Sequence, residues 1–178
     1  HGRGVAWAAN KLRQQAVVLM PKGSSEARFR AIAAEGARVS IEEVNYDECV
    51  RMAAAQSAAT PRSVVVQDTA WPGYEKIPSW IMQGYLTMIV ESVKSLENTP
   101  THIFLQAGVG AMAGAVTGFL ANYYGNEKPI ITIVEPDKAD CIYATALAND
   151  GKLHSVNGDL NTIMAGLACG EPCTLGWD

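Results

Sequence analysis

The sequence predicts an α/β fold with parallel sheets, on the basis of three observations. Short apolar runs of strand length, among them 16–20 and 130–134, alternate along the chain with segments of helical periodicity. The connections between them are short and carry Gly, Pro, Asn or Ser. One apolar run, 101–106, leads through a glycine-rich loop directly into a helix-forming segment. Because alternating strands and helices with short connections form right-handed crossovers, we expect parallel sheets in a three-layer αβα arrangement.

The first part of the chain contains three predicted helices and three predicted strands. Ser24 precedes the second helix as a candidate N-cap, and Gly36 follows that helix, where a glycine is favoured. Asn45 or Asp47 begins the third helix. In chain order the expected elements are a helix at 5–14, a strand at 16–20, a helix after Ser24, a strand at 38–41, a helix to about 59 and a strand at 62–67.

The second part begins with a loop, 68–77, that is rich in aromatic and turn residues. Pro78 then opens a long helix, since a proline in the first helical turn removes no hydrogen bond. The elements expected after it are a helix at 79–96, a strand at 101–106, a helix at 112–124, a strand at 130–135 and a helix at 139–149. The tail from Gly151 gives no clear element. We therefore expect two domains, 1–67 and 68–178.

The composition argues against several classes of function. The 178 residues carry a net charge of −4 and 48% of them are hydrophobic, which is typical of a globular protein. Lysine and arginine form no cluster, so no nucleic-acid partner is expected, and no apolar run reaches the roughly 18 residues of a membrane span. The cysteines and histidines show no zinc-ligand spacing, so no metal is expected. We expect reduced thiols, and a disulfide between Cys141 and either Cys169 or Cys173 stays open.

The strongest local signal for a ligand is the glycine loop, Gly108-Val109-Gly110, at the start of a helix. Glycines allow the backbone to turn sharply, and the first N–H groups of a helix are unpaired and electropositive. This combination predicts a phosphate site. A dinucleotide fingerprint would need a third glycine at position 113, which is Ala, with Gly114 one place late. Tight packing of the helix on the strand, without any ligand, also explains the glycines.

Several stretches resemble the fold-type II pyridoxal-phosphate (PLP) enzymes, the tryptophan synthase β-like family, in the family's order and over nearly the whole chain. They are His1–Ala6, which is similar to the residues after the Gly-Asn pair of the cofactor-contacting loop, the Met-Pro-Lys segment 20–39, the phosphate loop 106–110, the Val-Glu-Pro strand end 134–136 and the segment 159–168. The longer strings 66–85 and 166–172 are similar to one subfamily, the diaminopropionate ammonia-lyases.

This resemblance implies a chemistry and a set of site residues. The cofactor would be pyridoxal 5'-phosphate, and the reaction the α,β-elimination of 2,3-diaminopropionate to pyruvate and two ammonia molecules. The family pattern assigns phosphate binding to the backbone amides of Gly108, Val109, Gly110, Ala111 and Met112. Asp68 matches an aspartate that acts as acid or base toward the amino-acid substrate, although a carboxylate after a strand also caps turns. His1 and Glu135 match positions near the cofactor; the alternative for Glu135 is a surface carboxylate.

The resemblance also concerns residues beyond this sequence. In the family, the lysine that carries PLP precedes the stretch matched by His1, and none of the seven lysines here lies in that motif. We therefore expect a piece of the enzyme that is inactive alone. Residues 1–67 would belong to the small domain and 68–178 to the large PLP-binding domain of a cytoplasmic homodimer. Two further hypotheses are another fold-type II lyase, such as a serine or threonine deaminase, and a non-catalytic fragment that retains only the phosphate loop.

Overall fold

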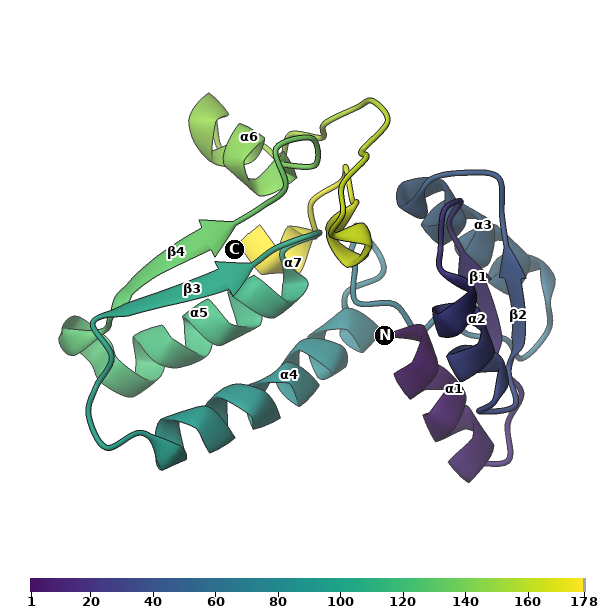
Figure 1. Ribbon diagram of the computed structural model, residues 1–178, viewed down its shortest axis with the longest axis horizontal. Coiled ribbons are helices and arrows are strands. Elements are labelled where there is room, and N and C mark those ends of the chain that lie inside the picture. The colour runs from purple at the N-terminus through teal and green to yellow at the C-terminus, as the bar shows by residue number, and fades with distance from the viewer. Residues whose placement is uncertain (178) are drawn as a thin grey trace. The chain divides into compact units, whose positions relative to one another are not determined.

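The computed structural model describes residues 1–177 and divides the chain into two compact units (Figure 1). The N-terminal unit comprises His1–Val66, and the C-terminal unit begins at Gln67. Each unit contains a two-stranded parallel sheet with helices packed on it. Within the described residues, no helix has both the length and the apolar character needed to cross a membrane.

The N-terminal unit is a β-α-β motif preceded and followed by a helix. Its sheet pairs β1 with β2 in parallel, with Val17 opposite Arg38 and Met20 opposite Ile41. A small core forms where α1 and α2 meet β1, around the buried side chains of Ala6, Met20 and Ile32. In order, the elements are α1 (Gly2–Lys11), β1 (Val17–Met20), α2 (Glu26–Ala33), β2 (Arg38–Ile41) and α3 (Tyr46–Ala59).

The helix starts in this unit follow the expected capping chemistry, with one correction. Asn45 caps α3 by accepting a hydrogen bond from the amide of Glu48 at 2.9 Å. The cap of α2 is Ser25, whose hydroxyl accepts from the amide of Arg28, and not Ser24. Ser24 instead donates its hydroxyl to the carbonyl of Pro21 at 2.7 Å, which closes the turn before the helix. Gly36, at φ +91°, follows α2 as predicted.

The predicted third strand, 62–67, is wrong. Residues 63–67 form no strand, although the run Val64-Val65-Val66 has the β-branched side chains that favour one. A strand requires a neighbouring strand to supply ladder hydrogen bonds, and the sheet in this unit consists of β1 and β2 within the described residues. Val64 is 64% exposed, so this segment also lacks a covering layer.

The C-terminal unit alternates strands and helices as the sequence predicts. The long helix begins earlier than expected and includes Pro78 in its first turn. The elements are α4 (Lys76–Ser95), β3 (His102–Gln106), α5 (Ala111–Tyr124), the 3₁₀ turn η1 (Gly125–Glu127), β4 (Ile130–Val134), α6 (Cys141–Ala148), the 3₁₀ turn η2 (Ala165–Leu167) and α7 (Thr174–Trp177).

The core of this unit lies between one face of β3–β4 and the helices α4 and α5, which run along the same side of the sheet (Figure 1). Side chains alternate between the two faces of a strand. Leu105 therefore points into the core with its neighbours Ile103, Ile131 and Ile133, and meets Val116 and Leu120 of α5. Ile89 and Val93, four residues apart on α4, complete the cluster.

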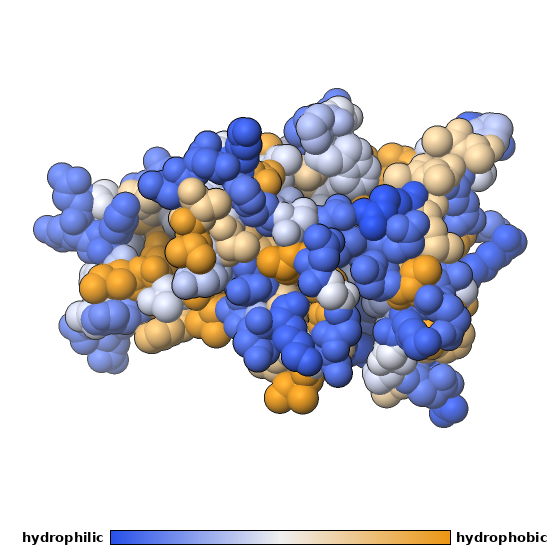
Figure 2. Space-filling model, turned by 90° about the horizontal axis from the view of Figure 1, so that it is seen from above, coloured by the Kyte–Doolittle hydropathy of each residue, from blue (hydrophilic) through white to orange (hydrophobic). Residues whose placement is uncertain are grey.

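The opposite face of β3–β4 is apolar and open among the described residues. Phe104 is 67% exposed and Ile130 is 60% exposed, and Val134 lies on the same face. Figure 2 shows apolar residues reaching the molecular surface in several places between hydrophilic ones. Parallel sheets are normally covered on both faces, so this face has the character of a buried surface.

The short C-terminal helix α7 packs closely against the start of α5. A Cβ atom added to Gly114 of α5 would lie 2.8 Å from the Cα atom of Gly176. A Cβ on Gly176 would in turn lie 2.7 Å from the carbonyl carbon and oxygen of Gly110. Gly114 is therefore a packing glycine, which explains why it stands one place late for a dinucleotide fingerprint.

We predict opposite effects from two glycine-to-alanine changes in α5. Alanine is ordinarily about 1 kcal/mol better than glycine inside a helix. Gly118→Ala should raise the free energy of unfolding, because nothing lies within 4 Å of the added methyl group. Gly114→Ala should lower it by about 1–3 kcal/mol, because the methyl group meets backbone that cannot move aside. Urea unfolding of both variants checks this, and a stabilised Gly114→Ala would contradict the packing of α7.

Candidate cofactor-binding site

The glycine loop joins β3 to α5 and presents backbone amides that have no acceptor among residues 1–177. Gly110 is the N-cap of α5 and has φ +91°, a conformation that an L-residue adopts only with strain. Within residues 1–177 no acceptor is found for the N–H groups of residues 108–112. Gly110 and Ala111 are nevertheless buried. Buried amides are almost always paired, so these donors are suited to an anionic ligand at the electropositive end of α5.

The Cα side of the same loop is tightly packed by the protein. A Cβ on Gly108 would lie 3.1 Å from the Sγ atom of Cys169 and 3.4 Å from the Cα atom of Leu167. A Cβ on Gly110 would lie 2.8 Å from Cδ1 of Ile142. Packing therefore favours glycine at both positions, and the evidence for a ligand rests on the amides and not on the glycines.

Cys173 connects the glycine loop to the segment that carries Asp68. Its backbone amide donates to the carbonyl of Val109 at 2.7 Å. Its Sγ atom accepts from the amide of Ala70 at 3.2 Å, and the thiol lies 3.4 Å from the carbonyl oxygen of Asp68, to which it donates. The side chain is fully buried. These contacts fix the position of the Asp68 backbone relative to the amides at the start of α5.

The carboxylate of Asp68 is held by a tyrosine of α4. Tyr85 donates its hydroxyl to Oδ2 of Asp68 at 2.6 Å, and both side chains are half-buried. The preceding residue, Gln67, is held by Tyr74, whose hydroxyl accepts from the Gln67 amide at 2.9 Å and donates to its carbonyl. Tyr74 stacks on Trp71 with ring centroids 4.3 Å apart. The aromatic residues of this loop thus serve to order the segment around Asp68.

Glu135 follows β4 at the same sheet edge as the glycine loop and binds the start of α6. Its two carboxylate oxygens accept from the amides of Ile142 at 2.9 Å and Tyr143 at 2.7 Å. Burial raises the pKa of Glu135 above its ordinary value, and the two amide hydrogen bonds oppose that shift. The structure therefore gives Glu135 a helix-capping role, and its contact with a cofactor stays a prediction.

His1 lies in the N-terminal unit, immediately before α1. Its Nε2 atom lies 2.8 Å from the carbonyl oxygen of Val66, so the imidazole connects the two ends of that unit. The side chain is exposed. Its predicted contact with the cofactor ring also stays a prediction.

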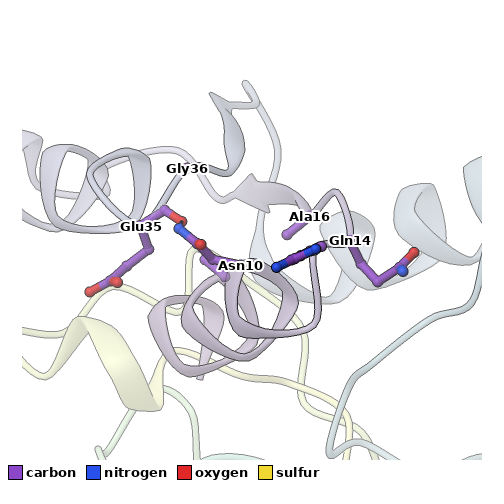
Figure 3. Close-up of a pocket in the computed structure, with 7 residues that line it drawn as sticks. Asn10, Gln14, Ala16, Glu35 and Gly36 are labelled. Carbon is purple, nitrogen blue, oxygen red and sulfur yellow. Dashed lines mark hydrogen bonds between the residues drawn. The ribbon is translucent and has the colours of Figure 1, made fainter.

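A cavity of about 220 Å³ lies within the N-terminal unit, and none of the residues predicted for the site lines it (Figure 3). Asn10 and Glu35 line it, and the Asn10 side-chain amide donates to the Glu35 carbonyl at 2.9 Å. This contact joins α1 to the turn after α2, so we interpret the cavity as a gap in the packing between these two elements.

Within residues 1–177, no three His, Cys, Asp or Glu side chains are grouped to hold a metal ion, and the four cysteines are free thiols.

The chain belongs to the pyridoxal-phosphate dependent enzymes, since the model of that family matches residues 1–178. It is 54% identical over 181 residues to the diaminopropionate ammonia-lyase of Escherichia coli K12, covering all of this chain and 45% of that protein. The enzyme of Salmonella typhimurium is 52% identical over 99% of this chain and 45% of its own length. This chain therefore spans less than half the length of these relatives, and the predicted resemblance is confirmed.

Solved structures agree with this assignment. The holo diaminopropionate ammonia-lyase of E. coli superposes with a TM-score of 0.87 at 53% identity, over 99% of this chain and 44% of that one. The same enzyme with an aminoacrylate–PLP azomethine reaction intermediate gives 0.88 at 52% identity, over 99% and 45%. A threonine deaminase of Solanum lycopersicum, at 22% identity over 99% and 48%, shares the fold with a TM-score of 0.77. The predicted fold-type II α/β class is confirmed, and with it the family's cofactor, pyridoxal phosphate.

The residues of the glycine loop fit the phosphate group of that cofactor. A phosphate carries acceptor oxygens and negative charge, and the start of α5 offers unpaired amides and the positive end of a helix dipole. A further buried polar atom without a partner in residues 1–177, the Thr174 hydroxyl, lies next to Cys173 in the chain. When bound, pyridoxal phosphate supplies an electron sink for negative charge at the α-carbon of an amino acid.

Sequence reasoning missed two residues of this site. The sequence marks Cys173 only as a thiol without nucleophilic activation, and Tyr85 only as one of several aromatic residues near the Asp68 loop. Their contacts join positions 103 and 17 residues apart in the chain. The one available sequence signal is the spacing of Tyr85, Ile89 and Val93, which places the tyrosine on the core-facing stripe of α4.

We predict that the Cys173 thiol is protected from alkylation in the folded protein. Burial raises its pKa above the ordinary value, so the reactive thiolate is scarce at neutral pH. Because folding raises this pKa, the thiol's stabilising contribution is fully present below the unfolded pKa of roughly 8.5 and is lost as pH rises through the folded pKa. Iodoacetamide labelling followed by peptide mass spectrometry should modify Cys173 slowly in buffer and rapidly in urea. Equal rates would contradict its burial.

Proposed function

We propose that the protein to which this chain corresponds catalyses the PLP-dependent α,β-elimination of 2,3-diaminopropionate. Water is consumed, and the products are pyruvate and two ammonia molecules. The single observation that carries this proposal is the 54% identity to a diaminopropionate ammonia-lyase over the whole chain. The unpaired amides of α5 and the Asp68 carboxylate, linked through Cys173, supply the two local elements that such a reaction needs.

The amides of Gly108, Val109, Gly110, Ala111 and Met112 bind the phosphate in this proposal. Donors fixed at the end of a helix orient an anion without reorganising when it binds. Gly110, in its left-handed conformation, turns the chain so that the loop and the first turn of α5 face the same ligand. By the family pattern, His1 and Glu135 are assigned to positions near the cofactor. In this proposal the N-terminal unit corresponds to the family's small domain and the C-terminal unit to its PLP-binding domain.

Asp68 is the proposed acid or base toward the substrate. Its oxygen Oδ2 accepts from Tyr85, and within residues 1–177 no hydrogen bond to Oδ1 is found, which leaves Oδ1 for proton exchange. Proton transfer by a positioned carboxylate typically contributes about 10²–10⁴-fold to a rate.

The family resemblance extends the proposal to a homodimer in the cytoplasm. The exposed apolar face around Phe104 and Ile130 supports burial of this surface in a larger assembly.

Binding of the phosphate to the α5 amides can be tested in this chain with a proline substitution. Met112 is the second residue of α5, where proline deletes the N–H without breaking an intrahelical bond, as Pro78 does near the start of α4. A hydrogen bond to a charged group is worth about 1.5–3 kcal/mol. Met112→Pro should therefore weaken binding of pyridoxine 5′-phosphate, which lacks the aldehyde that labels surface lysines, by about 10- to 100-fold.

Met112→Ala is the matched control, because it removes the same side chain and keeps the amide. Titration calorimetry should give Met112→Ala an affinity within about threefold of the wild type, and circular dichroism should show that both variants fold. Equal affinities for the alanine and proline variants would remove the amide from the binding site.

The reaction is tested in the whole protein by measuring pyruvate from 2,3-diaminopropionate, serine and threonine at equal concentrations. We expect the diamine to have the highest kcat/KM. Asp68→Asn keeps the shape of the side chain but removes the base, so it should lower kcat by about 10²–10⁴-fold. A preference for serine or threonine would favour a deaminase, and full activity of Asp68→Asn would remove Asp68 from the chemistry.

A further inference from the structure

Tyr85 pairs with Asp68 from a helix, α4, that packs in the core of the C-terminal unit. Tyr85 lies four residues before Ile89 and eight before Val93 on α4, so all three side chains face the core side of that helix. The tyrosine hydroxyl donates to Oδ2 of Asp68 at 2.6 Å, a short distance typical of a hydrogen bond to a charged acceptor. The helix that contributes Ile89 and Val93 to the core thus also carries the donor, and the donor holds the carboxylate.

The surroundings of the Tyr85 hydroxyl keep it protonated. Burial raises the pKa of Tyr85 far above its ordinary value, and the hydrogen bond to Asp68 and the negative charge of the Asp68 carboxylate raise it further. A hydroxyl that does not ionise near neutral pH donates a hydrogen bond to Asp68 and keeps its proton. Tyr85 is therefore a permanent donor to one oxygen of the carboxylate, and not itself a base.

The backbone of Asp68 is restrained independently of its side chain. The Cys173 thiol contacts the Asp68 carbonyl, and the Tyr74 hydroxyl holds both backbone groups of Gln67. With the backbone fixed at these points, the remaining freedom of Asp68 is rotation of its carboxylate. The Tyr85 hydrogen bond is the contact that restricts this rotation.

We propose that Tyr85 is a positioning residue that holds Oδ2 of Asp68 and thereby directs Oδ1 toward the substrate for proton transfer. This inference rests on the proposed function, in which Asp68 is the acid or base. In the forward direction a proton passes from the α-carbon of the amino acid to Oδ1, and Asp68 becomes a neutral carboxyl group. The electron pair left on carbon is stabilised by the electron sink that the cofactor supplies. The Tyr85 proton stays on the tyrosine throughout.

The chain offers a matched control for this proposal. Tyr85→Phe removes the hydroxyl that binds the carboxylate of Asp68, whereas Tyr74→Phe removes a hydroxyl that binds the backbone of the neighbouring residue, Gln67. Both hydroxyls are partly buried, and both lie near Asp68. A merely structural role for Tyr85 predicts similar consequences for the two variants, whereas a positioning role predicts different ones.

The first measurement uses this chain without cofactor. With 13C-labelled aspartate, the side-chain carboxyl resonance of Asp68, assigned with Asp68→Asn, should shift in Tyr85→Phe and stay close to the wild-type position in Tyr74→Phe. An unchanged resonance in Tyr85→Phe would overturn the pairing on which the proposal depends.

The second measurement uses the whole protein and 2-deuterated diaminopropionate. Tyr85→Phe should lower kcat by about tenfold with KM changed less than about threefold, and the deuterium isotope effect on kcat/KM should increase because proton transfer becomes slower. Tyr74→Phe, which leaves the hydrogen bond to the carboxylate in place, should change both values less than Tyr85→Phe does. An active wild-type protein with equal kinetics in Tyr85→Phe would overturn the positioning role, whereas an inactive wild-type protein would overturn the proposed elimination itself.

Discussion

The buried residue Cys173 connects the two parts of the candidate site through three hydrogen bonds. Its amide binds the carbonyl of Val109 in the glycine loop, while its sulfur accepts from the Ala70 amide and donates to the Asp68 carbonyl. The neighbouring residue Thr174 adds a further contact, since its amide donates to the carbonyl of Ala70 at 3.3 Å. Catalysis that combines a bound anion with a proton-transferring carboxylate requires a fixed distance between them. A neutral, fully buried thiol provides such a connection without adding a charge to the site.

The electrostatic character of the site follows from the same arrangement. Among residues 1–177 the amides at the start of α5 have no acceptor, which favours a dianionic phosphate. Asp68 lies on the segment before α4, and its carboxylate is paired with a neutral donor, the hydroxyl of Tyr85. The carboxylate of Glu135 is stabilised by the first amides of α6, which donate to both of its oxygens.

Local patterns predicted most of the elements but few of the contacts. The cap at Asn45 depends on neighbouring residues alone and was one of the two predicted starts of α3, and the strand at 38–41 was also predicted, although it needs β1 as its partner. The run Val64-Val65-Val66 has the same local character as a strand, yet it forms none, because strand formation depends on a partner that sequence periodicity does not reveal. The glycine loop was visible as a strand followed by glycines and a helix. Tyr85 and Cys173 were not, because their roles arise only when α4 and the residues after Pro172 fold against the Asp68 loop.

The central claim is that the amides at the start of α5 bind the phosphate of pyridoxal phosphate. The most direct measurement is the detection of 15N–31P couplings across hydrogen bonds in 15N-labelled chain saturated with pyridoxine 5′-phosphate. The account predicts couplings to amides among residues 108–112, including Gly110 or Ala111. Saturable binding with couplings to other residues, for example around the cavity lined by Asn10 and Glu35, would contradict it.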